Sequence, residues 1–511
     1  MKMLAGGGLG MSMGLPGCRN TTAEEAAGGI PWGTPPESVA NLLPQTTPDG
    51  VLEVFLMGGL NPWDTFYAVP EHGAPDGDPR YRNTQWHTFQ EGENNVASTY
   101  RDLCGGTGDL LSPFAPDALG RMVNFGPWLY EFRDRPDILN RTRVFVMQHG
   151  FEPHEVASPY ALTGHPRGEQ RMAATGAHIQ RHFSELHGYR PEPYAYTIFS
   201  GDSEIEAQFD INSASASGLH PASARPLALR LAEDSERLAQ QLRRESMGGY
   251  ASQSDALINQ YLSRYRSQLL VGSSGLHHHA SDLDDLVAAR RTMADGAAIA
   301  HLLPPEILKP QLGSVVCQSQ SGLDTTFMGL RLAAHLLTNP TARARYVNYV
   351  DSGLINATGA GYDTHDFHVV ESSRNLVHLT RNLKFWINDK DENHPQKLDL
   401  DRHMVLLTTE FGRTPSPEFG KPKGLDHWPL GYVVVAIGGP ITEDHKGVIG
   451  SIGPDGIAET GSTPSEMRAA TLMAQGIWPF SNQSFAVGDI RNATTEANAA
   501  SMLMDRFWAP T

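Results

Sequence analysis

Carboxylates, imidazoles and a guanidinium follow one apolar, strand-like run of this sequence. The run 402–412 closes with Glu410, Arg413 follows it, and the next loop carries Asp426 and His427. Carboxylate oxygens and imidazole nitrogens together suit zinc, manganese or iron, whereas calcium and magnesium favour the oxygens. Such groups at a strand end therefore predict a divalent-metal site.

The same pattern recurs after three other apolar runs. A single Asp–His pair is more often a capped turn or a salt-bridged loop than a pair of ligands. In open α/β sheets, however, ligands bind beyond the carboxyl ends of the strands, so polar groups at several such ends favour one shared site with more than one ion. The groups are Asn61 and Asp64 after 51–59, His149, His154 and Ser158 after 141–150, and Asp363, His365, Asp366 and His368 after 344–353.

Three residues are candidate catalytic residues, each with a structural alternative. His154 is a ligand or a general acid, or else a hydrogen-bonded loop histidine. Glu410 is a ligand of a third ion, a group that orients a ligand, or the acceptor for Arg413. Arg413 clamps a phosphate or sulfate through its planar fork, or forms a structural pair with Glu410.

Five apolar runs must position these groups, and each is expected to form a buried strand. Helical patterns lie between them: an apolar face over 369–386, and a capping box with Thr463 and Glu466 at the start of 463–477. Strands that alternate with helices predict an α/β fold with a central sheet flanked by helices. The five runs span 51–59, 141–150, 344–353, 402–412 and 430–439.

The chain divides into four segments by composition. Residues 1–49 hold a signal-like apolar stretch and a polar linker. The segments 50–204 and 341–511 are the two parts of the α/β body, and the second carries most of the metal motifs. The charged, helix-rich segment 205–340 is expected to form a helical insertion or cap.

The composition limits the compartment and the partners. A formal net charge of −17 argues against nucleic acid or an anionic membrane surface as the main partner. A small anionic substrate stays open, because metal ions and arginines reverse the field locally. The apolar start, residues 1–18, is typical of a secretion signal and too short for a transmembrane span of about 20 residues. Cys104 and Cys317 can form one disulfide if the protein is exported, but the sequence leaves that open.

Several motifs are similar to those of one known family. "GGLNPWDTF", "GYDTH", "EFGRTP" and "GLDHWPLGYVVVAIGG" resemble exported bacterial proteins catalogued as domain of unknown function 1501, in the alkaline phosphatase/sulfatase superfamily. The resemblance spans roughly residues 50–480. It implies an alkaline phosphatase-like central sheet with a two-metal site at the strand ends. It also implies the metal-ligand positions, which are Asp64, Asp363, His365, Asp426 and His427.

The resemblance leaves the nucleophile open. Superfamily phosphatases attack with a serine or threonine alkoxide, yet Asn61 and Pro153 stand where relatives often carry serine. Thr65 and Ser158 remain candidates, with a helix cap and a turn as their structural alternatives. A water molecule activated at a metal ion could also attack directly.

Two functions of different classes fit these observations. The first is a metal-dependent hydrolase of small anionic phosphate or sulfate esters, exported to the periplasm or the cell surface. It would use two divalent ions, of zinc, manganese, calcium or magnesium. The second is a non-catalytic binding or assembly component of an exported complex, which the doubtful nucleophile favours. The sequence does not favour a formylglycine sulfatase, because neither Cys104 nor Cys317 lies in the Cys-x-Pro-x-Arg setting.

Overall fold

The computed structural model describes most of the α/β body and little of the segment predicted to be an insertion. Residues 1–31, which include the predicted secretion signal, lie outside the described residues. The described residues are 32–44, 46–72, 86–89, 95–169, 171–186, 196–200, 227–230, 257, 260–261, 264, 303–309, 311, 316–319, 324–340, 344–354, 361–421, 423–480 and 484–511.

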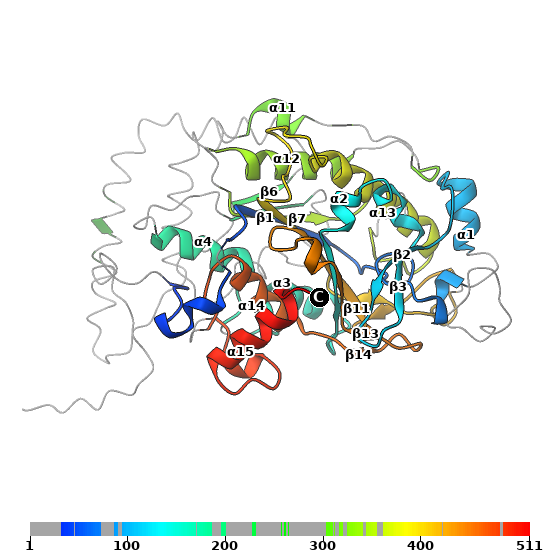
Figure 1. Cartoon of the computed structure of the whole chain (residues 1–511). Helices are drawn as coiled ribbons and strands as arrows, with labels where there is room; N and C mark the ends of the chain where they lie inside the picture. The colour runs from blue at the N-terminus through cyan, green and yellow to red at the C-terminus, as the bar shows by residue number, and fades with distance from the viewer. Residues whose placement is uncertain are drawn as a thin grey trace, which may run out of the picture.

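Within these residues, an eight-stranded sheet forms the centre of the molecule (Figure 1). Its spatial order is β12-β4-β11-β8-β1-β7-β5-β6. All five runs predicted as strands lie in this one sheet, so the expected α/β architecture is confirmed. In spatial order the strands span Gly447–Ile449, Thr142–Met147, Tyr432–Gly438, His403–Thr408, Gly50–Leu56, Tyr346–Asp351, Tyr196–Ser200 and Leu227–Arg230.

The described part of the sheet is mostly parallel. β1 pairs in parallel with β7 and β8, β5 does so with β7 and β6, and β12 with β4. β11 alone runs the other way, antiparallel to both β4 and β8. The start of β11 therefore lies at the same sheet edge as the ends of its neighbours, which matters for the residues that precede it.

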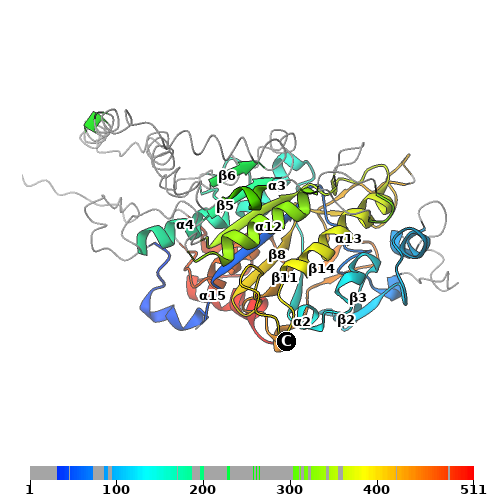
Figure 2. The same ribbon diagram turned by 90° about the horizontal axis from the view of Figure 1, so that it is seen from above.

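Helices cover both faces of the sheet, and for this reason its central strands are buried throughout. α12 and α13 pack together over the face that carries Leu52 and Val54 of β1 (Figure 2). α3, α4, α14 and α15 pack on the opposite face, which carries Val51 and Phe55. The helices in chain order are α3 (His154–Thr163), α4 (Thr175–Leu186), α12 (Thr325–Thr338), α13 (His368–Trp386), α14 (Pro464–Ala474) and α15 (Glu496–Leu503).

Local sequence signals mark two of these helices correctly. α13 covers the predicted apolar face, and α14 begins with the predicted capping box. In that box the Thr463 hydroxyl accepts from the backbone of Glu466, and the Glu466 carboxylate accepts from the backbone of Thr463. The shorter elements are α1 (Val96–Ser98), α2 (Pro136–Leu139), α11 (Pro305–Leu308) and the two-stranded ladders β2 (Ser112–Pro116) with β3 (Met122–Phe125), β9 (Gly412–Arg413) with β10 (His427–Trp428), and β13 (Ser451–Ile452) with β14 (Ala458–Thr460).

Parts of the segment 205–340 belong to the α/β body itself. β6 adds a strand beside β5, and α12 packs directly against β1 and β7. Cys317 of this segment forms a disulfide with Cys104. Most of the predicted helical insertion or cap lies outside the described residues. Of the described helices, none has the length and apolar character that crossing a membrane requires.

Candidate metal centre

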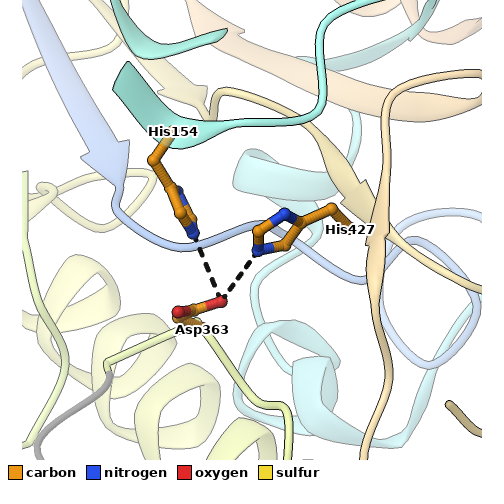
Figure 3. A group of neighbouring side chains, drawn as sticks. All are labelled: His154, Asp363 and His427. Carbon is orange, nitrogen blue, oxygen red and sulfur yellow. Dashed lines mark hydrogen bonds and ion pairs between the residues drawn. The ribbon is translucent and has the colours of Figure 1, made fainter. Parts of the chain in front are cut away.

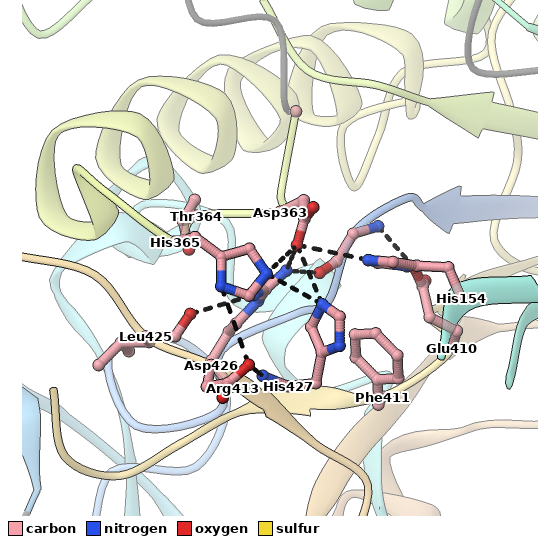
Figure 4. Close-up of polar contacts among 12 residues, drawn as sticks. His154, Asp363, Thr364, His365, Glu410, Phe411, Arg413, Leu425, Asp426 and His427 are labelled. Carbon is pink, nitrogen blue, oxygen red and sulfur yellow. Dashed lines mark hydrogen bonds and ion pairs between the residues drawn. The ribbon is translucent and has the colours of Figure 1, made fainter. Parts of the chain in front are cut away.

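The candidate centre lies at the sheet edge where β1, β7 and β8 end (Figure 4). β1 leads to Gly58, β7 is followed by the loop with Asp363, and β8 leads to Glu410. Because β11 runs the other way, the strand β10 that precedes it brings His427 to the same edge. There His427 pairs with Arg413 across the β9–β10 ladder. Loops far apart in sequence thus meet at one edge.

Nitrogen atoms of four residues converge on one carboxylate oxygen, Oδ1 of Asp363. The Nε2 atoms of His154 and His427 lie 3.4 Å and 3.3 Å from it (Figure 3). Nε2 of His365 lies 3.1 Å from the same oxygen, and Nη2 of Arg413 donates to it (Figure 4). We refer to these five residues as the Asp363 cluster.

Carboxylates accept hydrogen bonds from the second ring nitrogen of two imidazoles of the Asp363 cluster. Nδ1 of His154 donates to Oε1 of Glu410 at 2.8 Å, and Nδ1 of His365 donates to Oε2 of Glu418 at the same distance. A carboxylate on one ring nitrogen fixes the tautomer and aims the other nitrogen, as is usual for metal-binding histidines. Glu418 was not predicted as a site residue, because it lies in a Pro/Gly-rich loop without a recognisable motif.

The potential ligand atoms form two groups that share one histidine. The inner group is His154, Asp363 and His427, and the outer group is His365, Asp426 and His427. Within each group, one ligand atom per residue lies within 4.8 Å of the others. Oδ1 of Asp426 is 3.8 Å from Nδ1 of His365 and also accepts from the backbone of His427. The mixed nitrogen and oxygen donors fit one or two divalent ions.

The electrostatics of the Asp363 cluster centre on a charged carboxylate. Burial alone raises the pKa of Asp363, but hydrogen bonds from the three imidazoles and the charge of the guanidinium hold it well below its usual range. Burial lowers the pKa of His154, yet contacts with Asp363 and Glu410 outweigh burial and raise it to about 9. Contact with Asp363 likewise raises the pKa of His365. Positive charge is therefore strongly favoured beside Asp363.

Glycines let the loops of the centre come close together. Gly58 has a φ of +110°, and a Cβ atom on it would lie 2.2 Å from the backbone nitrogen of Asp363. Gly58 also donates its N–H to Glu410 at 2.8 Å. At Gly424, a Cβ atom would overlap the backbone carbonyl of His365. Neither position has room for a larger residue without displacing a loop that carries a candidate ligand.

Arg413 is fully buried, and protein groups occupy both ends of its fork. Nη2 donates to Asp363 and to the carbonyl of Gly58. Nη1 donates to the carbonyl of Leu425 at 3.1 Å and lies 3.5 Å from Nε2 of His365. Its carboxylate partner is thus Asp363, whereas Glu410 contacts His154. This arrangement suits a residue that positions Asp363 better than one that clamps a substrate anion.

Asp64 has a different environment from the other four predicted metal ligands. It is completely buried, and its Oδ2 lies 3.1 Å from Nε2 of His368. The amide of Asn61 contacts the same His368 nitrogen, and the hydroxyl of Thr364 contacts the other. Among the contacts of the described residues, none joins Asp64 to the Asp363 cluster directly. The structure brings together Asp363, His365, Asp426 and His427, with His154, Glu410 and Arg413 beside them.

Neither candidate nucleophile contacts the Asp363 cluster within the described part of the chain. The Thr65 hydroxyl donates to the backbone carbonyl of Asn61. Ser158 lies in α3, and its side chain is completely buried. Pro153 immediately precedes α3, whose first residue is His154.

Of the comparisons with known proteins, the match to a family model agrees with the recognised motifs. A search of curated proteins finds no match. The family model described as "Protein of unknown function (DUF1501)" matches residues 208–479, a shorter range than the motifs suggested. The matched range contains Asp363, His365, Glu410, Arg413 and His427, whereas Asp64 and His154 precede it. Because the match covers more than half of the 511 residues, the chain belongs to this family of proteins of unknown function.

Proposed function

We propose that this protein is a metal-dependent hydrolase of phosphate or sulfate esters, of the alkaline phosphatase superfamily type. One observation carries the proposal. Three Nε2 atoms face Oδ1 of Asp363, and two of the three imidazoles donate a hydrogen bond from Nδ1 to a carboxylate. Metal centres commonly have this arrangement of histidines.

The hydrogen-bonding pattern requires positive charge at the centre. When His154 is neutral and donates Nδ1–H to Glu410, its Nε2 lone pair faces Asp363, so two acceptors meet 3.4 Å apart. Likewise, when His365 is neutral and donates Nδ1–H to Glu418, its Nε2 lone pair faces Oδ1 of Asp363. Such contacts are stable only when protons or a cation lie between the acceptors. A divalent ion supplies that charge without protonated histidines.

The charge balance and the donor types favour two ions of zinc or manganese. Four carboxylates contact the imidazoles, those of Asp363, Glu410, Glu418 and Asp426, and one guanidinium, that of Arg413, opposes them. Three imidazoles make the site richer in nitrogen than calcium or magnesium prefer.

The chain's own residues have distinct roles in this proposal. His154 and Asp363 would hold one ion and His365 and Asp426 the other. His427, which lies in both ligand groups, would bind one of the two, because its Nε2 has a single lone pair. Ions bound there would neutralise the charge of the ester oxygens and lower the pKa of an attacking water molecule. Arg413 fixes Asp363, and the ring of Phe411 stacks on His427 with centroids 4.4 Å apart. These contacts preorganise the site before substrate arrives.

The disulfide supports a location outside the cytoplasm. Disulfides persist in oxidising compartments and are rare in the cytosol, where thiols are kept reduced. The bond between Cys104 and Cys317 thus agrees with export to the periplasm or the cell surface, as the signal-like start of the sequence predicts.

A non-catalytic binding or assembly role is the second candidate. It is favoured by the position of Thr65, whose hydroxyl is bonded to the Asn61 carbonyl rather than directed at the Asp363 cluster. A protein of this kind would keep the ions as structural or ligand-binding groups and would not turn over an ester.

Metal analysis followed by an ester screen separates these functions. We expect the purified protein to bind about two zinc or manganese ions per chain and to hydrolyse at least one class among aryl phosphates, phosphodiesters and aryl sulfates. His427→Ala should abolish both properties, because His427 belongs to both ligand groups. His394→Ala, at an exposed histidine on another loop, is the matched control. Bound metal without any hydrolysis would favour the binding role, and a protein without metal affinity would exclude the proposal.

A further inference from the structure

The two carboxylate–histidine pairs of the centre are alike in geometry but differ in surroundings. In each pair a glutamate accepts from Nδ1 at 2.8 Å, and Nε2 faces Asp363. The Glu410 side chain is 0% exposed, whereas that of Glu418 is 20% exposed. The chain therefore contains a natural comparison between a buried and a solvated version of one arrangement.

The inner pair is held by regular elements and by several contacts. Glu410 follows β8 and accepts from Gly58 N–H as well as from His154. His154 is the first residue of α3, and its ring packs against Phe411 with centroids 4.9 Å apart. An ion in the inner group would meet ligands that are already fixed.

The outer pair depends on the loop between β9 and β10. Glu418 lies in that loop. Its Oε2 accepts from His365, while its Oε1 is 3.3 Å from Nζ of Lys421, so a second cation shares the charge of the carboxylate. Asp426, the acidic residue of the outer group, has a side chain that is 52% exposed. Water screens these charges, and binding an ion must also order the loop side chains.

We infer that the two metal positions differ in affinity, and that Glu418 sets the affinity of the weaker, outer one through His365. This inference rests on the proposed function, since it presupposes that the centre binds metal. Glu418 is a positioning residue: it keeps a hydrogen on Nδ1 of His365 and thereby presents the Nε2 lone pair. Loss of such a partner typically weakens metal binding about 10- to 100-fold.

Titration of the metal-free protein with Co²⁺ alone tests this inference. Visible absorption bands of Co²⁺ report ligand binding directly, without any enzymatic activity. We expect two binding steps in the unaltered protein. Glu418→Gln should weaken only the weaker step, by about 10- to 100-fold, and Glu418→Asp should restore part of the loss because it keeps the charge. Asp426→Ala, at an exposed ligand, should remove the weaker step.

Glu392→Gln is the matched control. Glu392 is a loop glutamate that also pairs with a lysine, at 2.7 Å from Lys397, but it contacts no residue of the centre. Glu392→Gln should leave both Co²⁺-binding steps unchanged. Thermal unfolding of each variant should show that the fold is retained. A weaker step that Glu418→Gln leaves unaltered, whatever Asp426→Ala does, or a single step in the unaltered protein, would overturn the inference while leaving the proposed function intact. Absence of Co²⁺ and Zn²⁺ binding in the unaltered protein would instead overturn the proposed function.

Discussion

Two Asp–His arrangements lie next to each other in this protein, and they differ in what surrounds the carboxylate. Asp363 is partly exposed and meets nitrogens from three imidazoles and one guanidinium. Asp64 is completely buried and meets one imidazole, that of His368. Thr364 connects them, because it lies between Asp363 and His365 in sequence while its hydroxyl contacts His368.

The comparison shows that residue type alone does not bring potential ligand atoms together. Both arrangements hold a carboxylate and a histidine, but only around Asp363 do ligand atoms from several loops converge. The Asp64–His368 contact instead ties the loop after β1 to the start of α13, and the buried Oδ1 of Asp64 has no hydrogen-bond partner in the described part of the chain. Under the proposed function, metal binding is therefore expected at the Asp363 cluster, and the role of Asp64 as a metal ligand stays a prediction.

The largest expected effect comes from Asp363→Asn. The substitution preserves size but removes the charge that the inner group and Arg413 require. Metal affinity should fall at least about 100-fold. The buried Arg413 would keep its carbonyl partners but lose the charge of its carboxylate partner, at a cost of about 3–5 kcal/mol in the free energy of unfolding. Metal content and urea unfolding measure the two effects. Full metal content in this variant would erase the distinction between the two carboxylates.

Gly58→Ala should have the next largest effect. The added Cβ atom would lie 2.2 Å from the Asp363 backbone, and φ is +110° at this position. We expect a loss of about 3 kcal/mol in stability together with weaker metal binding, because strain and overlap displace the loop that carries Asp363. Gly150→Ala is the control, since its Cβ atom meets nothing within 4 Å. Equal stability of the two variants would show that the close approach is unimportant.

Acidification should destabilise the protein through His149, a neutral histidine beside the centre. Burial lowers its pKa to about 4. Between pH 6.5 and 4 the unfolded chain binds a proton at His149 that the folded chain does not, so stability is present above pH 6.5 and is lost as the pH falls towards 4. From pH 6.5 to 5 this loss amounts to about 2 kcal/mol.

The contribution of His149 can be isolated with His149→Gln. Urea unfolding of the metal-free protein at several pH values should give a shallower dependence in this variant, because glutamine does not titrate. An unchanged slope would mean that other groups cause the acid sensitivity. His154 provides the contrast, since its contacts with carboxylates raise its pKa to about 9.

The smallest effect is expected for Asp64→Asn, the same substitution in the other arrangement. An asparagine amide can donate to Nε2 of His368, so the buried contact remains possible. We expect a change of about 1 kcal/mol in stability and an unaltered number of bound ions. Loss of an ion on this substitution would return Asp64 to the ligand set that the sequence motifs implied.

Much of the fold could be predicted from the sequence because its signals are local. Unbroken apolar runs such as 430–439 identify strands that are covered on both faces, and the capping box at Thr463 marks the start of α14. Those signals do not give strand order or direction. The reversed direction of β11 arises from pairing with β4 and β8, which are distant in sequence.

The candidate site was predictable in its residue types and only partly in its membership. The motifs singled out Asp363, His365 and His427, because paired acids and histidines at strand ends are recognisable chemistry. Glu418 could not be found in this way, since a lone glutamate in a loop has no pattern. Its contact with His365 exists only because the loop between β9 and β10 folds back on the centre.

The sequence by itself determined which groups are available: the apolar strands, the helix caps, and a chain rich in carboxylates and histidines at the strand ends. Only the tertiary structure decided how they combine. It paired Arg413 with Asp363 rather than Glu410, held two histidines in place with carboxylates, and separated Asp64 from the Asp363 cluster. The physical reason is that hydrogen bonds and ion pairs depend on distances of a few ångströms between atoms, and residues hundreds of positions apart reach such distances only when the sheet and its loops are assembled.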